Sequence, residues 1–397
     1  MTTTTPNQFV SSDELRALAS DGTKLRYALM ELAAQIPDAI ALGRGDPDLD
    51  TPPHIIAAAE AAIRDGRADM PAPAAGLPAL REAIAAKLRR DNGIPVDADG
   101  VLVTSGGQEA LYLLIQALID PGDEILVPDP RYTSYDEAIA QAGGTQVLVP
   151  TLPEDDFDLK PEAIAQLITP RTKALLLVTP SNPTAGIVSP ESLRGIAELA
   201  KQHNFIVISD EIYEKFIYPP GEHLSIASLP GMWERTITLN GFSKTYAMTG
   251  WRVGYVAAPP EFIRVLTEFK RAASDRTAAV SQYAALAAIT GPQECVAEFH
   301  ATYTRRRKVM LDGLTALGFS YSEPLGAFYV YANAASTGIS AFELSYLLLR
   351  EAQVLIFPGT SFGAKWVDWL RISLLQPEDV LQEALRRMAG VLERHRR

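Results

Sequence analysis

Lys244 is the residue of this chain whose surroundings most clearly indicate a chemical role. It lies in the sequence NGFSKTYAMTGWR, residues 240–252, directly after the short apolar run 236–239. Burial disfavours the charged form of an amine, so a lysine at the end of a buried strand loses its proton more easily than one in water. The neutral amine is a nucleophile that forms Schiff bases with aldehydes. The segment therefore predicts covalent chemistry at Lys244.

Two turns elsewhere in the chain hold groups that can bind an anion or donate a hydrogen bond. Gly106 and Gly107 join the apolar run 101–103 to a helical stretch. Glycines in such a turn let backbone N–H groups and the positive end of the helix dipole approach an anion closely. Asn182 follows another apolar run, in the sequence TPSNPT. Asn-Pro is also common in loops, so this motif gains meaning only beside the others.

Two charged residues occur in runs that are expected to be buried. Asp210 follows the run FIVIS, where a carboxylate needs a partner because an unpaired buried charge is costly. Arg371 lies inside the sequence WLRIS, where an arginine seldom stays unpaired. Arg371 could form a structural ion pair with a carboxylate of the chain, or it could bind an anionic ligand.

The elements that must position these residues are short apolar runs that alternate with amphipathic helical stretches from about residue 75 to 260. Continuous apolar runs are typical of strands covered by helices on both faces, and this alternation predicts a mostly parallel sheet in an α/β fold. Ligands of such sheets bind beyond the carboxyl ends of the strands, where the motifs lie. The predicted strands are 101–103, 125–127, 174–178, 206–209, 236–239 and 253–257.

The pattern changes after about residue 290, where longer helical stretches surround short strands. The predicted helices are 292–317, 341–352 and 377–393, and the predicted strands are 327–331 and 369–372. We interpret this region as a second, smaller α/β domain. The first residues are expected to pack with it, because they precede the first regular α/β unit. The predicted division is a large domain, 49–290, and a small domain made of 1–48 and 291–397.

Composition excludes several classes of function. The formal net charge of −12 argues against nucleic-acid binding, which needs clustered lysine and arginine. Cys295 is the single cysteine, so no intramolecular disulfide can form. The first residues lack the basic and apolar segments of a signal peptide, and no uncharged apolar stretch is long enough to span a bilayer. These features predict a cytoplasmic protein without a membrane partner.

Taken together, the segments resemble the class I and II aminotransferases of fold type I, the pyridoxal-phosphate enzymes similar to aspartate aminotransferase. The resemblance rests on Gly-Gly, Asn-Pro, Asp-x-x-Tyr, Ser-Lys and Arg motifs that recur in order over most of the chain. It implies a fold type I architecture, with a mostly parallel central sheet in a large domain and a smaller α/β C-terminal domain. It also implies pyridoxal 5′-phosphate as the cofactor, no metal ion, and a homodimer with sites at the subunit interface.

The resemblance assigns most of the motif residues to the cofactor. It implies that Lys244 holds the cofactor as an internal aldimine, that Asp210 pairs with the protonated pyridine nitrogen, and that Tyr213 reaches the phenolic oxygen. The other implied contacts are a phosphate cradle, a residue stacked on the ring, a second donor to the phenolic oxygen and an arginine on the phosphate. By this resemblance, Gly106, Gly107 and Gln108 form the phosphate cradle and Tyr132 stacks on the ring. Asn182 is the second donor to the phenolic oxygen, and Arg252 is the arginine on the phosphate.

For the substrate, the resemblance implies that Arg371 binds the α-carboxylate, with Gly45 and Asn182 beside it. The chain departs from the family pattern in three places. Ala185 and Gly186 stand where the family usually has a glycine directly after Thr184. Gly241 stands where many members have a phosphate-binding serine, so Ser243 is expected to contribute in its place. Pro71 occupies the position of a tyrosine that reaches the neighbouring subunit. We hypothesise that Arg276 partly replaces that tyrosine or approaches the partner's substrate.

The expected reaction is transfer of an amino group from an L-amino acid to a 2-oxo acid through a pyridoxamine phosphate intermediate, with Lys244 as general base and acid. A lyase, decarboxylase or cyclopropane-forming enzyme on the same scaffold is the alternative, because it would share the lysine, aspartate and arginine. A sensing domain without catalysis is a further alternative, but it would need a DNA-binding domain for which the chain has too few residues before Gly43. The sequence does not reveal the amino donor.

Overall fold

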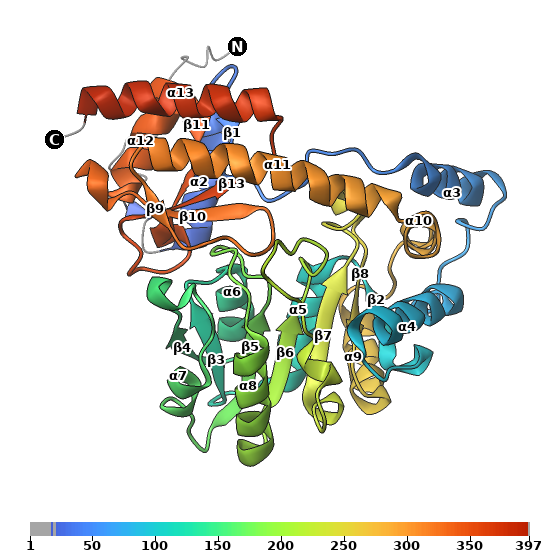
Figure 1. Ribbon diagram of the computed structural model, residues 1–397. Coiled ribbons are helices and arrows are strands. Elements are labelled where there is room, and N and C mark those ends of the chain that lie inside the picture. Colours follow the sequence, from blue (N-terminus) through green and yellow to red (C-terminus); the bar gives the residue numbers. More distant parts are fainter. Residues whose placement is uncertain (1–16, 19–20, 396–397) are drawn as a thin grey trace, which may run out of the picture.

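The computed structural model describes residues 17–18 and 21–395, which form a larger and a smaller α/β part (Figure 1). The larger part is built on a seven-stranded sheet in the order β2-β8-β7-β6-β5-β3-β4. Every strand is parallel to the others except β8, which is antiparallel to both of its neighbours. The strands are β2 (Val101–Thr104), β3 (Glu124–Asp129), β4 (Thr145–Pro150), β5 (Thr172–Val178), β6 (Ile206–Asp210), β7 (Thr236–Gly241) and β8 (Gly254–Ala257). A mostly parallel sheet in an α/β fold is therefore confirmed.

Helices cover the faces of this sheet, which explains why most of its strands are buried and largely apolar. The helix α8 (Pro190–His203) shows how the sequence defines one of them: Ser189 caps its first turn, and Asn204 ends it in the left-handed region with φ of +55°. Its apolar face packs on the sheet. The other helices of the larger part are α3 (Pro53–Arg64), α4 (Pro78–Asn92), α5 (Gly107–Leu118), α6 (Ser134–Gln141), α7 (Pro161–Ala165), α9 (Pro260–Ala273) and α10 (Ala279–Thr290).

The smaller part contains an antiparallel sheet in the order β12-β13-β10-β9, which lies with its helices above the larger sheet in Figure 1. Its strands are β9 (Ser320–Tyr321), β10 (Tyr329–Asn333), β12 (Phe357–Pro358) and β13 (Trp369–Ser373). Its helices are α11 (Glu294–Ala316), α12 (Ala341–Ala352) and α13 (Glu378–His395). The N-terminal segment adds α2 (Gly22–Ala34) and β1 (Ile40–Ala41), which pairs with β11 (Val354–Leu355). The domain limits at 48/49 and 290/291 stay a prediction.

Two strand predictions were incomplete. The sequence analysis missed β4, an edge strand whose residues are mostly exposed or half-buried, although its residues 147–149 form an apolar run. The strand predicted at 327–331 begins two residues later, because Ala327 has φ of +54°, which is not an extended conformation. No helix in the described residues is both long and apolar enough to cross a membrane.

Candidate active site

A cavity of about 460 Å³ lies between the two parts of the fold and gathers almost all the predicted site residues. It is lined by residues that follow the carboxyl ends of strands in the larger sheet, by the N-terminal segment and by the small sheet. The predicted residues in its wall are Gly45, Gly107, Gln108, Tyr132, Asn182, Asp210, Tyr213, Ser243, Lys244, Arg252 and Arg371. Gly106 does not line the cavity itself but lies against Arg252.

Lys244 reaches into this cavity from the loop after β7. Its Nζ donates a hydrogen bond to the Gly45 carbonyl oxygen at 2.8 Å and lies 3.6 Å from Oδ1 of Asp46. Burial lowers the pKa of the amine below its ordinary value, and Arg252 and Arg371 lower it further, although Asp46 opposes the shift. The amine is therefore more easily deprotonated than a surface lysine, as a nucleophile requires.

Asp210 ends β6 on the floor of the cavity. Its Oδ2 accepts a hydrogen bond of 2.6 Å from the Tyr135 hydroxyl, and its Oδ1 accepts one from the Ile212 backbone N–H at 3.2 Å. Burial raises the pKa of this carboxyl, while the bonds from Tyr135 and Ile212 work against that shift. Within the described residues Asp210 has no ion-pair partner, so a cation placed in the cavity would be held strongly.

Tyr213 is the second residue of the Asp-x-x-Tyr motif in the cavity wall. Its hydroxyl lies 3.1 Å from the hydroxyl of Tyr329, which comes from β10 of the small sheet. Burial, with Tyr329 beside it, raises the pKa of Tyr213 well above its ordinary value, so the phenol stays protonated and can donate a hydrogen bond.

Arg371 is buried in β13 without a carboxylate partner among residues 17–18 and 21–395. Its Nη1 donates to Oδ1 of Asn182 at 2.9 Å, and its Nη2 donates to the Gly43 carbonyl oxygen. Its Nε is buried and has no partner in the same residues. The aromatic ring of Tyr329 packs on the guanidinium carbon at 4.5 Å from the ring centroid. Arg371 is thus a buried cation whose donors are satisfied only by neutral groups, which favours binding of an anion.

The turn before α5 and the loop before β8 form an anion cradle. Gly106 has φ of +85°, and a Cβ built on it would lie 2.4 Å from Nη2 of Arg252. The backbone of Arg252 is in the left-handed region, with φ of +51°. Its guanidinium donates hydrogen bonds to the backbone oxygens of Thr249 and Ser105, at 3.0 and 3.4 Å. Ser243 is buried nearby in the cavity wall. The glycine therefore lets a guanidinium lie against the N-terminus of a helix, an arrangement suited to a phosphate.

Four residues of the site escaped the sequence analysis. Tyr135 donates a hydrogen bond to Asp210, and Asp46 forms an ion pair with Lys244. Tyr329 shares a hydrogen bond with Tyr213, and Arg26 lines the cavity wall. Asp46 was the one with a local signal, since it directly follows the predicted Gly45.

Pro71, which departs from the family pattern, and Arg276, the hypothesised replacement for the missing tyrosine, have ordinary surroundings. Pro71 is exposed, and Arg276 lies outside the cavity wall, with 42% of its side chain exposed and its Nε 3.2 Å from the carboxylate of Asp275. A role for Arg276 toward a partner subunit stays a prediction.

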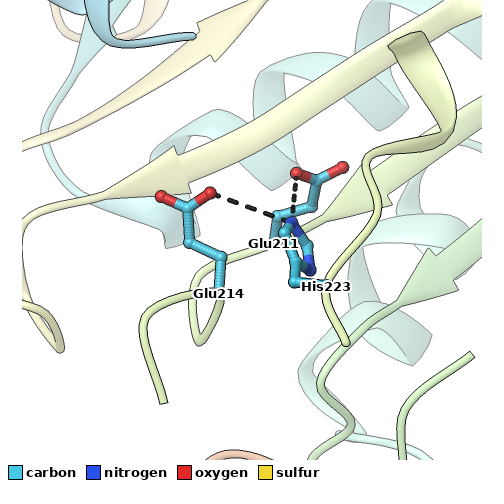
Figure 2. Close-up of side chains that lie close together, drawn as sticks. All are labelled: Glu211, Glu214 and His223. Carbon is cyan, nitrogen blue, oxygen red and sulfur yellow. Dashed lines mark hydrogen bonds and ion pairs between the residues drawn. The ribbon is translucent and has the colours of Figure 1, made fainter. Parts of the chain in front are cut away.

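A buried polar cluster lies behind the loop that carries Asp210 and Tyr213. Figure 2 shows Glu211, Glu214 and His223 turned toward one another, with ligand atoms within 4.8 Å, close enough to suggest a metal site. The carboxylates already have partners: Lys87 and Asn92 bind Glu214, and two serines donate to Glu211. We therefore interpret the cluster as an ion-pair network that fixes the loop.

This network predicts a pH-dependent contribution to stability. Burial alone would lower the pKa of His223, but the hydrogen bond to Glu211 raises this pKa above the ordinary histidine value. The stability that the charged histidine contributes is therefore fully present below the ordinary histidine pKa and is lost as pH rises through the raised pKa. His223→Asn is expected to lower the free energy of unfolding by about 1–2 kcal/mol near pH 5.5 and by less near pH 9. Urea denaturation at both pH values measures this difference.

The exposed pair between His395 and Glu351 provides the control, because His395→Asn removes a histidine–glutamate contact of similar length from the surface. Its effect is expected to stay below about 0.5 kcal/mol. An equal loss of stability for His223→Asn at both pH values would contradict a charged histidine. Glu214 contributes to stability with the opposite pH dependence. Burial would raise its pKa, but Lys87 and His223 lower the pKa to about 2. The stability that ionised Glu214 contributes is therefore lost only in strong acid.

Comparisons with known proteins agree with this geometry. Residues 37–388 match the model of the family "Aminotransferase class I and II". The chain is 42% identical to an aspartate aminotransferase of Pyrococcus abyssi, over 92% of this chain and 94% of that protein. It is 38% identical to an aromatic-amino-acid aminotransferase of Thermococcus litoralis, again over 92% of this chain and 94% of that protein. The solved structure of aspartate aminotransferase from Thermus thermophilus with maleate is 41% identical and superposes with a TM-score of 0.88, covering 93% of this chain and 96% of that one. The chain therefore belongs to the aminotransferase class I and II family and is an aminotransferase.

Proposed function

We propose that this aminotransferase works with pyridoxal 5′-phosphate attached to Lys244 and transfers the amino group of an L-amino acid to a 2-oxo acid. One observation carries the proposal: an easily deprotonated lysine amine and an arginine without an acidic partner face the same cavity. The first suits an aldehyde, and the second suits the α-carboxylate of an amino acid.

The residues present fit the cofactor in charge and shape. Its phosphate suits the cradle at Gly106, Gly107 and Arg252, where a Cβ on Gly106 would collide with the guanidinium. Its pyridine nitrogen, when protonated, suits Asp210, which is buried without a cationic partner among the described residues. The phenol of Tyr213 is the donor available to its phenolic oxygen. Further contacts are proposed from Gln108, Tyr132, Asn182 and Ser243, which line the same cavity.

When bound, pyridoxal 5′-phosphate supplies an electron sink for the negative charge that develops at the substrate Cα. The residues of the chain do the rest. Arg371 and Asn182 hold the α-carboxylate, and the Gly45 carbonyl and Asp46 orient Lys244. Once an incoming substrate amine has taken its place on the cofactor, the freed Lys244 Nζ would remove the proton from the substrate Cα as a general base and return it as a general acid. Asp210 would pair with the protonated pyridine nitrogen, and its negative charge would favour the electron sink.

The visible absorption spectrum of the purified protein tests this proposal. A yellow band that one amino acid bleaches, and that 2-oxoglutarate or pyruvate restores, is expected. Release of pyruvate and ammonia without an added 2-oxo acid would instead indicate a lyase on the same scaffold. A colourless protein that takes up no pyridoxal phosphate would overturn the proposal.

Gly106→Ala is expected to weaken the binding of pyridoxal 5′-phosphate by about 10- to 100-fold, because Arg252 must leave the cradle to make room for the methyl group. Fluorescence titration of the cofactor into the apoprotein measures the affinity. Gly122→Ala is the matched control: Gly122 also has a positive φ, +97°, but nothing lies within 4 Å of a Cβ there. Both variants strain the backbone, so an equal loss of affinity in the two would contradict a cradle at Gly106.

We further propose a homodimer that works in the cytoplasm. Exposed large apolar side chains in the N-terminal part of the sequence support the dimer, since Tyr27, Ile63 and Met70 are 61, 60 and 72% exposed. A lone cysteine is consistent with a reducing compartment. Light scattering during size-exclusion chromatography tests the dimer, and a monomeric mass at micromolar concentration would contradict it.

A further inference from the structure

Buried arginines are few in this chain, and they differ in how their charge is balanced. The described residues include three: Arg26, Arg306 and Arg371. Arg306 forms a two-bond ion pair with Asp48, at 2.7 and 2.8 Å. Neither Arg26 nor Arg371 has an acidic partner in the described part of the chain. A buried cation without a counter-charge is costly, so both indicate binding of an anion from outside the described residues.

Arg26 projects from α2 into the wall of the same cavity as Lys244. Its Nη1 donates to Oγ1 of Thr133 at 2.8 Å and to the Ser361 carbonyl oxygen at 2.7 Å, and its Nη2 donates to Oγ1 of Thr23 at 3.3 Å. These neutral acceptors occupy three of the five N–H groups of a guanidinium. The remaining donors have no acceptor in the described residues, and they are available to a ligand in the cavity.

Arg26 lies close to the arginine that is proposed to bind the α-carboxylate. The guanidinium carbons of Arg26 and Arg371 lie 5.2 and 4.7 Å from the centroid of one ring, that of Phe362, so they can be no further apart than the sum of these distances. Burial lowers the pKa of Arg26 to about 10, and the charge of Arg371 contributes to the shift. Two cations held this close repel each other, and a ligand with two negative groups would relieve the repulsion.

The phosphate of the cofactor is a less suitable partner for Arg26. Its cradle is formed by Gly106, Gly107 and Arg252, whereas Arg26 is fixed to the loops that carry Thr133 and Ser361 and shares a ring with Arg371. Arg26 therefore faces the substrate side of the cavity.

We propose that Arg26 is a specificity-determining residue that binds the second carboxylate of a dicarboxylic amino acid or 2-oxo acid. The inference rests on the proposed function, because it assigns the first carboxylate to Arg371. It also places the second site on α2, in the same chain as Arg371.

Steady-state kinetics with two donors of different charge test this inference on the full-length holoenzyme. Arg26→Gln is expected to lower kcat/KM for L-aspartate by about 100-fold and to change kcat/KM for L-alanine by less than about threefold. Arg26→Lys keeps a point charge and is expected to recover part of the aspartate activity. Binding of maleate, a dicarboxylate that cannot react, is expected to weaken by a similar factor in Arg26→Gln, while binding of butyrate is unchanged.

Arg44→Gln is the matched control for loss of charge. Arg44 also borders the cavity, but 62% of its side chain is exposed and its Nη2 lies 3.9 Å from the carboxylate of Asp46. Its replacement is expected to alter the preference for aspartate over alanine by less than about threefold.

Three outcomes would overturn the role of Arg26: an equal fall in kcat/KM for both donors in Arg26→Gln, a selective fall in Arg44→Gln of the same size, or a wild-type enzyme that prefers alanine. If Arg26 only anchors α2, kcat/KM is expected to fall equally for both donors in Arg26→Gln, together with a lower melting temperature. Arg26→Lys is then expected not to recover the aspartate activity. Each leaves the aminotransferase assignment standing. Failure of the proposed function would appear differently, as a wild-type spectrum that no amino acid alters.

Discussion

Replacing Lys244 with alanine is expected to lower turnover by at least about 10⁴-fold, the largest effect of any single substitution in this chain. General acid–base catalysis alone contributes about 10²–10⁴-fold, and this variant also loses the covalent attachment of the cofactor. Stability is expected to change little, because the side chain makes one hydrogen bond, to the Gly45 carbonyl oxygen, and one long ion pair, to Asp46. Single-turnover and steady-state assays with saturating pyridoxal 5′-phosphate measure the loss.

Lys244→Arg separates the role of the amine from that of its charge. The guanidinium keeps a positive charge beside Asp46 but is not deprotonated in proteins, so it can act neither as a nucleophile nor as a base. Both variants are therefore expected to be inactive while far-ultraviolet circular dichroism and the melting temperature stay near the wild-type values. Multiple turnovers by either variant would refute the assignment of Lys244.

The sheet and the location of the site could be predicted because both have local signals. The runs that became β5 and β6 are largely apolar, and every residue of β7 is buried, as expected for strands covered on both faces. Lys244 and Asn182 follow such runs, Asp210 ends one, and the carboxyl ends of parallel strands meet at one edge of a sheet. The edge strand β4 was missed although residues 147–149 form an apolar run as short as the one at 101–103, and its apolar Leu148 is exposed in the structure.

The partners of the site residues could not be predicted, because contacts between distant segments leave no trace in local sequence. Asp210 was expected to need a partner, but its hydrogen bond comes from Tyr135, 75 positions earlier. Arg26 had no signal at all: its acceptors Thr133 and Ser361 are 107 and 335 positions away. Only the folded chain shows that these groups meet in one cavity.

Arg371→Leu is expected to lower kcat/KM for every amino donor by about 10³-fold, because the substrate α-carboxylate loses its charged partner inside a buried site. The same substitution is expected to change the free energy of unfolding of the ligand-free protein by less than about 1 kcal/mol. Removing a buried cation without an acidic partner relieves a desolvation cost. The groups it leaves, Oδ1 of Asn182 and the Gly43 carbonyl oxygen, belong to residues of the cavity wall, where water can replace the lost donors.

Arg306→Leu is the matched control, since Arg306 is equally buried but paired. Its removal leaves the Leu374 carbonyl oxygen without its donor and the carboxylate of Asp48, 23% of whose side chain is exposed, without its two-bond partner, which is expected to cost about 1–3 kcal/mol of stability. The two variants should therefore separate activity from stability: Arg371→Leu loses activity toward all donors and keeps its melting temperature, and Arg306→Leu does the reverse. An Arg371→Leu protein that melts as early as Arg306→Leu would show that Arg371 has a structural role, because a buried arginine kept for an anion outside the chain contributes nothing to folding until that anion binds.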